Sequence, residues 1–317
     1  MRVYRGPGDL PAEARGAAVA IGNFDGVHRG HRAVIARTRA LAEELGVASG
    51  VVTFEPHPRE LLDPERAPPR LTSFARKAEL LRALGIDQLH VLRVRPQLLQ
   101  LSPEAFVERI LVGILGVRAV VTGADFRFGH RRTGDVAILV ALGQRFGFAV
   151  EAMEKIAIEG IVCSSTRIRQ AIAAGAVREA ANLLGYAYEL SGGVVAGDRL
   201  GRSLGYPTAN LRLAGRRPLL PADGIYAVRA GIRRSGGWSW HPAVASLGVR
   251  PTFGGGERRL EVHLLDGRHE LYGLRMRVAF LERLREERRF DTLEALVAEM
   301  ARDCARAREV HGLEPAP

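Results

Sequence analysis

The sequence predicts an α/β domain with a doubly wound parallel sheet, followed by a small antiparallel β-barrel and a C-terminal helix. Up to about residue 184, short apolar runs alternate with stretches of helical periodicity, which is typical of βαβ units. From about residue 186, short alternating strands follow one another between glycines and prolines, as in small antiparallel barrels or sandwiches. We therefore expect one domain over residues 1–185 and a second over residues 186–317.

The first half contains four short apolar runs that predict buried strands, at residues 17–21, 47–54, 89–94 and 118–122. Apolar residues at helical spacing predict helices at residues 30–45, 73–84 and 103–115. The last of these has Ser102 as its N-cap and Pro103 at its first position. One or two further helices over residues 165–184 close the domain.

The second half is predicted to contain strands at residues 193–195, 225–232, 243–247, 260–265 and 276–281. A long amphipathic stretch at residues 292–310 predicts the final helix. No low-complexity linker separates the halves, so we expect them to be closely coupled.

Composition excludes several classes of protein. With 47% hydrophobic residues in 317, the chain is too apolar for global disorder, and no apolar stretch reaches the roughly 20 residues that span a bilayer. No secretory signal is visible, so we expect a cytoplasmic protein. Cys163 and Cys304 match no metal-ligand spacing and are not expected to form a disulfide.

The net charge of +11 favours anionic partners such as nucleotides. Lys77 and Lys155 are the only lysines among 46 basic residues, so the excess comes from arginine. These arginines are spread along the chain without a basic block or a nucleic-acid-binding signature. We therefore expect neither nucleic acid nor a membrane to be the main partner.

The segment GNFDGVHRGH, at residues 22–31, lies where the first predicted strand turns into the first helix. Glycines allow backbone N–H groups to approach a phosphate, and a helix N-terminus adds positive potential. His28 and His31 share one face of the first turn, where imidazoles can donate hydrogen bonds to phosphate oxygens. The alternative is a capped helix with two surface histidines. We expect a nucleotide phosphate to be bound here by Gly22, Asn23, Phe24, Asp25, Gly26 and Gly30.

A second candidate anion site precedes the helix at residue 165 and consists of Ser164, Ser165, Thr166 and Arg167. Hydroxyls, backbone amides and a guanidinium suit a diphosphate leaving group. The alternative is a Ser/Thr N-cap beside a solvated arginine.

Two loops at the carboxyl ends of predicted strands would line the same crevice. In GADFRFG, residues 123–129, Asp125 lies between aromatics and could hold a planar heterocycle. The alternative is a loop whose phenylalanines fill the core. The segment TFEPHP, residues 53–58, closes the second strand.

The barrel half carries a glycine-rich loop, residues 197–210, that ends in the polar residues Thr208 and Asn210. These two are two positions apart in an extended segment, so their side chains point the same way. Their oxygens suit Mg²⁺, which prefers oxygen ligands and nucleotide phosphates. The alternative is an ordinary polar turn.

Residues 260–266, LEVHLLD, alternate between apolar and polar residues. Leu260, Val262 and Leu264 are expected to face the core, and Glu261 and His263 to face the other way. A carboxylate that projects into a pocket could serve as general base for a substrate hydroxyl. The alternative is a glutamate that faces solvent.

Together, GNFDGVHRGH, TFEPHP, GADFRFG and SSTRIR resemble the nucleotidylyltransferase superfamily, whose hallmark is His-x-Gly-His. More narrowly, they are similar to the FAD synthetase module of the prokaryotic bifunctional riboflavin kinase/FAD synthetases. The segments GRSLGYPTANL, DGIYAV, GVRPTFGGGERRLEVHLLD and LYG resemble the riboflavin kinase module of the same family. The resemblance covers nearly the whole chain.

This resemblance implies a two-step synthesis of flavin cofactors. The barrel would transfer the γ-phosphoryl group of ATP to riboflavin, and the first domain would transfer AMP from a second ATP to FMN, giving FAD and pyrophosphate. It implies that Glu261 activates the ribityl 5′-hydroxyl and that His28 and His31 are catalytic. It also implies that Thr208 and Asn210 bind Mg²⁺ and ATP, within a loop whose further nucleotide-binding residues are Gly197, Arg202 and Gly205.

Three positions depart from the family pattern: Gly267 replaces an aromatic residue, Tyr206 replaces phenylalanine, and Cys163 replaces another small residue. At Gly267 a flavin-packing contact is missing or supplied elsewhere. A flavin-binding protein that lost one activity is therefore an alternative, and the charge leaves a nucleic-acid-binding protein as another. The expected partners are small molecules; weak homo-oligomerisation and delivery of flavin to apo-flavoproteins stay open.

Overall fold

A computed structural model describes residues 1–6, 10–196, 204–215, 217–249, 258–267 and 269–313 of the chain. The chain forms two compact units. The first contains Met1–Pro68 and Thr72–Ser164, and the second contains Pro69–Leu71 and Ser165–Pro317.

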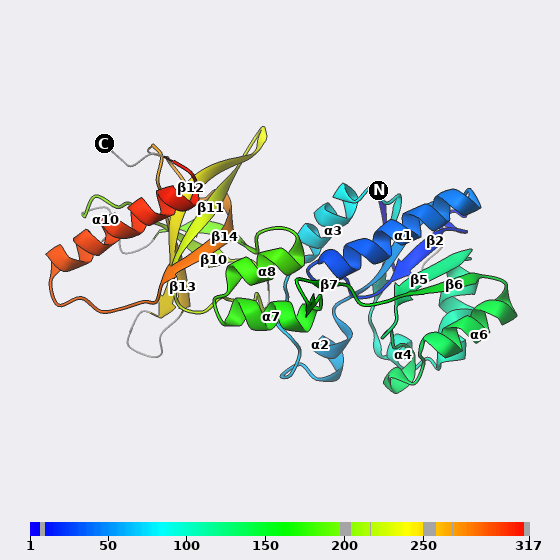
Figure 1. The fold of residues 1–317 in the computed structure, drawn as a ribbon. Helices are drawn as coiled ribbons and strands as arrows, with labels where there is room; N and C mark the ends of the chain where they lie inside the picture. Colours follow the sequence, from blue (N-terminus) through cyan, green and yellow to red (C-terminus); the bar gives the residue numbers. More distant parts are fainter. Residues whose placement is uncertain (7–9, 197–203, 216, 250–257, 268, 314–317) are drawn as a thin grey trace. The chain divides into compact units, whose positions relative to one another are not determined.

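The first unit is built on a six-stranded parallel sheet in the order β1-β4-β3-β2-β5-β6. Figure 1 labels β2, β5 and β6 of this sheet. Its strands are β1 (Arg2–Arg5), β2 (Ala18–Ile21), β3 (Ser49–Glu55), β4 (Gln88–Arg93), β5 (Ala119–Gly123) and β6 (Ala149–Met153). The four predicted strands are confirmed as β2 to β5. The two edge strands were not predicted, because partly exposed residues interrupt their apolar runs.

Helices and short turns connect these strands. They are η1 (Ala12–Ala14), α1 (Arg29–Leu45), α2 (Pro58–Leu62), α3 (Phe74–Ala83), α4 (Pro96–Leu99), α5 (Pro103–Phe106), η2 (Val107–Ile114), η3 (His130–Arg132) and α6 (Val136–Phe146). A two-stranded hairpin of β7 (Ala157–Ile158) and β8 (Ile161–Val162) follows β6. The predicted helix at 103–115 has the expected extent, but η2, its second part, is a π-helix.

The order of the strands places a topological switch at β2. From β2 the chain continues to β3 on one side of it, while β5 lies on the other side. In doubly wound sheets, ligands bind outside the carboxyl ends of the strands at such a point. Gly22, the first residue after β2, therefore begins the predicted phosphate-binding turn at the expected place.

The second unit contains a closed antiparallel barrel in the order β10-β13-β12-β11-β14-β9. It comprises β9 (Glu189–Val195), β10 (Ala209–Leu213), β11 (Gly224–Arg234), β12 (Gly237–Val249), β13 (Arg258–Leu264) and β14 (Arg275–Arg285). The predicted barrel is confirmed, with longer strands than expected. The final helix is also confirmed as α10 (Leu293–Val310), which Figure 1 labels. Its Ala307 belongs to a buried cluster with Ile225 and Leu284.

Two helices, α7 (Ser165–Ala173) and α8 (Val177–Leu184), belong to the same compact unit as the barrel. Arg178 of α8 pairs with Glu282 of β14, and a Cβ at Gly175 would meet Arg283 of β14. The contacts thus divide the chain after Ser164, whereas the sequence predicts the boundary at 185. The compact units do not test where the functional domains divide, so a functional boundary at 185 stays a prediction.

Among the described residues, no helix is long and apolar enough to cross a membrane. Cys163 and Cys304 are both described, and no disulfide joins them. Burial raises the pKa of the Cys304 thiol to about 11, so this group stays protonated at neutral pH.

Candidate active sites

The turn that follows β2 has an unusual backbone. Phe24 and Val27 have φ values of 48° and 39°, in the left-handed region that non-glycine residues rarely adopt. Both side chains are buried, so packing holds this conformation. Strained residues of this kind cluster at functional sites.

Asp25 holds this turn from within. Its Oδ1 accepts hydrogen bonds from the backbone N–H of Thr72 over 3.1 Å and from the Thr72 hydroxyl over 3.2 Å. The backbone N–H of Gly26 donates to the same Thr72 hydroxyl over 3.1 Å. Asp25 is 2% exposed, so its carboxylate is part of the frame of the turn. Thr72 was missed from the sequence, where it stands 47 residues away from Asp25.

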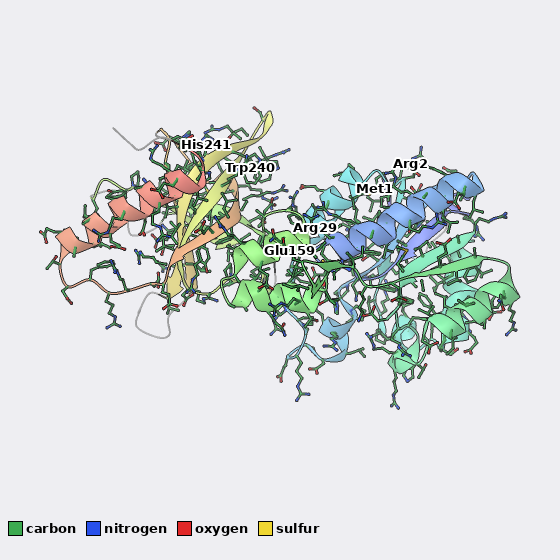
Figure 2. All side chains as sticks on the ribbon, in the orientation of Figure 1. Met1, Arg2, Arg29, Glu159, Trp240 and His241 are labelled. Atoms are coloured by element: carbon green, nitrogen blue, oxygen red, sulfur yellow. The ribbon has the colours of Figure 1, made fainter. Side chains whose placement is uncertain are left out.

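His28 and His31 are brought together as predicted. His28 is the N-cap of α1, and its Nδ1 accepts the backbone N–H of His31 over 3.3 Å. The two rings stack with centroids 3.6 Å apart. Because Nδ1 of His28 is an acceptor, the proton of the neutral ring lies on Nε2, where it can be donated. Figure 2 labels Arg29 at this end of α1.

Gly30 is needed for this stacking. A Cβ at position 30 would lie 3.2 Å from Cε1 and Nδ1 of His28 and 3.5 Å from Cβ of Cys163. The thiol of Cys163 receives a hydrogen bond from the backbone of Gly30, and burial raises its pKa. The chain just before Ser164 therefore lies against the first turn of α1.

A series of hydrogen bonds between polar side chains supports the turn that follows β2. Lys77, which is fully buried, donates to Glu55 Oε1 over 2.8 Å and to Thr53 Oγ1 over 3.4 Å. The Thr53 hydroxyl in turn donates to the backbone carbonyl of Asn23 over 3.1 Å. The side-chain Oδ1 of Asn23 is buried with no hydrogen-bond donor among the described residues. It can therefore accept a hydrogen bond from a ligand.

The loop after β5 agrees in part with each interpretation of its sequence, as a ligand-binding loop and as a loop that fills the core. Phe128 is buried and stacks on Phe126 with centroids 5.6 Å apart, so these rings fill the core. Asp125 is exposed, and one of its carboxylate oxygens lies 3.0 Å from Nζ of Lys155. Its side chain is therefore accessible to a ligand.

The segment at 164–169 spans the boundary between the compact units. Ser164 ends the first unit, and Ser165 begins α7 in the second. Thr166 and Arg167 are exposed, and Arg167 pairs with Glu179 of α8 over 2.7 Å. The predicted anion site is thus placed at the beginning of a helix, as expected.

In the barrel, the alternation along β13 is confirmed. Leu260, Val262 and Leu264 are buried, whereas Glu261 and His263 are partly exposed on the other face. Glu261 lies opposite Asn210 of β10 and Ser246 of β12 in the register of the barrel. Three polar side chains therefore stand side by side on its outer surface.

Two cavities lie on the barrel near Thr208 and Glu261. The first, of about 240 Å³, is lined by Glu261 together with residues of β14 and α10. The second, of about 430 Å³, is lined by Gly205, Asn210 and Gly267. Thr208 lines both cavities. Gly267 borders the second cavity. The other two residues predicted for this loop, Gly197 and Arg202, lie outside the described residues.

Thr208 and Glu261 are in direct contact, with Thr208 Oγ1 donating to Glu261 Oε2 over 3.2 Å. Asn210 lines the same cavity as Thr208, as the extended spacing predicts. The donors gathered here are a hydroxyl, an amide and a carboxylate. Oxygen donors of this kind fit Mg²⁺ better than a transition metal.

His263 fixes the loop that leads into Thr208. Its Nδ1 lies 2.9 Å from the backbone carbonyl of Pro207, which can only accept, so Nδ1 carries the proton. Burial lowers the pKa of His263, which favours this neutral form. Tyr206 packs edge-on against the ring with centroids 5.4 Å apart.

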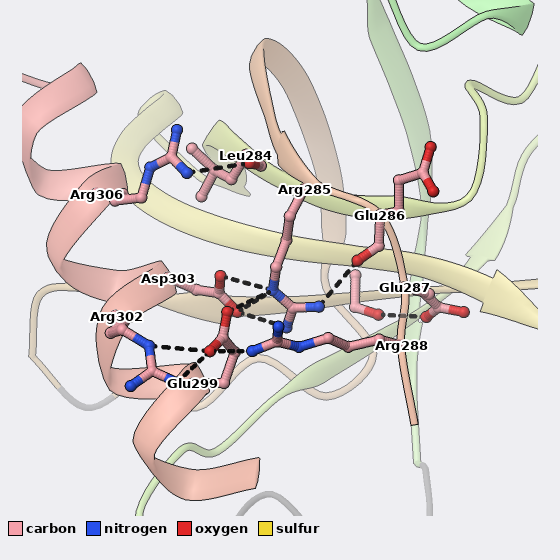
Figure 3. Close-up of polar contacts among 10 residues, drawn as sticks. Leu284, Arg285, Glu286, Glu287, Arg288, Glu299, Arg302, Asp303 and Arg306 are labelled. Atoms are coloured by element: carbon pink, nitrogen blue, oxygen red, sulfur yellow. Dashed lines mark hydrogen bonds and ion pairs between the residues drawn. The ribbon is translucent and has the colours of Figure 1, made fainter. Parts of the chain in front are cut away.

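The far wall of the first cavity was not predicted. Arg285 of β14 forks onto Asp303 of α10, with distances of 2.9 Å from Nε and 2.7 Å from Nη2 (Figure 3). Arg288 and Arg302 meet at Glu299, next to this pair (Figure 3). The carboxylate of Asp303 is thereby neutralised, and α10 is tied to the barrel beside the cavity.

Glu287 is a second carboxylate at this wall. It accepts a hydrogen bond from Ser246 over 3.1 Å, and a Cβ at Gly248 would overlap its carboxylate. Loss of solvent raises its pKa, and the negative charge of Glu261 adds to this effect. Glu287 lies 41 residues from Ser246, so sequence spacing could not reveal the pair.

Fold and sites together define a transferase that handles nucleotides, in which a nucleotidylyltransferase-like sheet unit is joined to a riboflavin kinase-like barrel unit. Residues 10–167 match the family model of FAD synthetase, and residues 184–311 match that of riboflavin kinase. The chain belongs to the family of bifunctional riboflavin kinase/FMN adenylyltransferases.

Relatives of this name match almost the full chain. The protein from Pseudomonas fluorescens is 47% identical over 97% of both chains, and that from Escherichia coli K12 is 40% identical over 99% of both. A crystal structure from Streptococcus pneumoniae, described as a macrolide-efflux protein, superimposes with a TM-score of 0.87. It is 31% identical and covers 97% of this chain and 99% of its own.

Proposed function

We propose that the barrel unit phosphorylates riboflavin and that the sheet unit adenylylates the FMN that results. The observation that carries this proposal is that Thr208 lines both cavities and donates a hydrogen bond to the carboxylate of Glu261, which lines the first. A substrate hydroxyl in the first cavity and a nucleotide in the second would meet at this carboxylate. Family membership, shown by full-length relatives that bear both names, supports the pairing of the reactions.

In the kinase step, Glu261 takes the proton of the ribityl 5′-hydroxyl while the hydroxyl oxygen attacks the γ-phosphorus of ATP. The bond from the γ-phosphorus to the β,γ-bridging oxygen breaks, and ADP leaves. The first cavity takes the flavin and the second takes ATP, with Gly205, Thr208 and Asn210 around the phosphates. Gly197 and Arg202 belong to the same proposed loop.

Mg²⁺ would be held by Thr208 and Asn210, whose oxygens suit a hard cation. When bound, the ion neutralises phosphate charge. The hydrogen bond from Thr208 meanwhile orients Glu261 toward the reacting hydroxyl.

In the adenylylation step, a phosphate oxygen of FMN attacks the α-phosphorus of ATP, and pyrophosphate leaves. The nucleophile is already an anion, so no general base is required. His28 donates from Nε2 to the developing charge on the α-phosphate, and His31, stacked on it, assists. The turn residues Gly22, Asn23, Phe24, Asp25, Gly26 and Gly30 shape the pocket.

The leaving pyrophosphate is assigned to Ser164, Ser165, Thr166 and Arg167. Within the first unit, the contact of Cys163 with Gly30 supports the assignment of Ser164, the next residue of the chain. Asp125 is assigned to the adenine or flavin heterocycle. We further propose that the functional domains divide at 185, that the protein acts in the cytoplasm, and that its partners are small molecules.

The test is chromatography of products after incubation of the protein with riboflavin, ATP and Mg²⁺. Both FMN and FAD are expected from riboflavin, and FAD alone from supplied FMN. Flavin that binds without conversion would overturn the proposal in favour of a binding protein. FMN without FAD would restrict the activity to the barrel.

A further inference from the structure

Three metal-ligating side chains gather on the barrel away from Thr208 and Asn210. They are His241 of β12, which Figure 2 labels, and Asp266 and His269, which follow β13. One ligand atom of each lies within 4.8 Å of the others. Neither proposed reaction uses these groups.

The geometry of this cluster suits a small cation. His241 Nδ1 lies 3.0 Å from Asp266 Oδ2, and His269 Nε2 lies 3.7 Å from Asp266 Oδ1. Zinc binds nitrogen and oxygen at about 2.0–2.2 Å, which in a tetrahedron separates ligand atoms by about 3.4 Å. The observed separations lie on both sides of this value, and Nε2 of His269 also lies 3.1 Å from the backbone carbonyl of Asp266, so binding would require this ring to turn from the carbonyl toward the ion.

The other ring nitrogen of His241 has a partner of its own. Its Nε2 lies 3.3 Å from the hydroxyl of Ser239, which itself donates to the carbonyl of Ile232 over 3.4 Å. Without a metal, Nδ1 donates to the Asp266 carboxylate; an ion that replaces this proton would leave Nε2 to donate to the Ser239 oxygen. Histidines that bind metals are oriented by such a hydrogen bond from the other ring nitrogen.

Gly267 leaves room for His269. The residue has a φ of 58°, and a Cβ there would lie 3.3 Å from Nε2 of His269. The position that departs from the family pattern thus stands beside the atom that would bind the metal. A larger side chain would press on this ligand.

We propose that His241, Asp266 and His269 bind a divalent transition-metal ion such as Zn²⁺. Imidazole nitrogens select such ions, whereas Mg²⁺ prefers oxygen. Three protein ligands leave a fourth position for water. The ion would link β12 to the segment after β13, where Gly267 and His269 line the larger cavity.

The test is titration of tag-free, chelator-treated full-length protein with Co²⁺, followed by its visible absorption, and then displacement of the cobalt by Zn²⁺. We expect one ion per chain and the intense bands of four-coordinate cobalt with nitrogen ligands. His241→Ala and His269→Ala should weaken binding by more than about 100-fold, and Ser239→Ala by roughly 10-fold. His269 lies outside the strands, so its variant should keep the fold.

His130→Ala, in the other unit, and Asn210→Ala, at the proposed magnesium site, are the controls. Both should retain the cobalt bands at full intensity. The proposal is overturned by the absence of saturable binding in the wild type. It is equally overturned by binding that survives in His269→Ala or that is lost in Asn210→Ala.

Discussion

Thr208 donates a hydrogen bond to Glu261 over 3.2 Å, so the residue shared by both cavities contacts the carboxylate that lines one of them. Glu261 lines only the first cavity, whereas Thr208 lines both. The proton acceptor and the proposed phosphate-binding loop are therefore coupled by one bond. Movement of the loop would reorient the carboxylate as well as the nucleotide.

Removal of either partner should impair the kinase reaction alone. Glu261→Ala is expected to lower kcat for FMN formation by about 10²- to 10⁴-fold, which is the usual contribution of a general base. Thr208→Val should lower it less, and Thr208→Ser should restore it, because the hydroxyl is kept. Adenylylation of supplied FMN should change little in all three. Loss of both activities in a folded variant would contradict the division of labour.

His28 has two separable roles, because it caps α1 and is placed to donate to phosphate. His28→Ala loses both, with a stability cost of about 1 kcal/mol for the missing cap. Asparagine is a good N-cap but has no Nε2. The variant His28→Asn should therefore unfold at the same temperature as the wild type and still fail to make FAD. Thermal unfolding and FAD formation from FMN measure the two roles. An active His28→Asn enzyme would show that the imidazole is only a cap.

Gly30→Ala should separate stability from activity. Alanine favours a helix interior over glycine by about 0.5–1 kcal/mol, and a displaced His28 loses a cap worth about 1 kcal/mol, so we expect the two effects to offset and the stability to change little. The new Cβ would lie 3.2 Å from the His28 ring and displace it, so FAD formation should fall. Gly236→Ala is the matched control, because nothing lies within 4 Å of its Cβ position. Unchanged FAD formation in Gly30→Ala would mean that the stacked geometry is not required.

His90 should make the first unit sensitive to acid. It is 2% exposed between Tyr4 and Gln88, and burial lowers its pKa from 6.5 to about 4. Between these values the unfolded chain binds a proton that the folded chain does not, so stability falls as the pH falls from about 6.5 to 4. The full loss attributable to His90 is about 3 kcal/mol.

Urea unfolding at pH 7, 5.5 and 4.5 measures this loss. His90→Phe, which keeps a ring against Tyr4, should flatten the dependence over this range. An equal slope in the wild type and in His90→Phe would assign the acid sensitivity to other groups.

In the first unit, the strands that the sequence predicts are those with both faces buried. The strands β2 to β5 are apolar runs of this kind, whereas β1 and β6 lie at the edges. The helix α6 was missed because its sequence VAILVALGQRF begins with an unbroken apolar run, which shows no helical period.

Residues of the candidate sites are predictable where local spacing alone places them. His28 and Glu261 are predictable because local spacing places them, one on a helix turn and one on an alternating strand. Thr72 and Glu287 are not, because each meets its partner only through the tertiary fold. The composition did contain one signal for site residues, because the chain is rich in arginine and has only two lysines. Lys77 pairs with Glu55 and Lys155 with Asp125, and both carboxylates belong to the sequence motifs.

The ion pair of Lys77 and Glu55 should stabilise the first unit asymmetrically. The Lys77 side chain is 0% exposed and that of Glu55 is 23% exposed, so water can still solvate the carboxylate if the lysine is removed. Glu55→Leu, which leaves a fully buried ammonium, should therefore cost more than Lys77→Met, within the roughly 3–5 kcal/mol of broken buried pairs. The double variant should recover part of the loss, because no charge remains in the pair. Urea unfolding of the four proteins at pH 7 measures these differences. Equal costs for the two single variants, with no recovery in the double variant, would show that the pair contributes no coupling to stability.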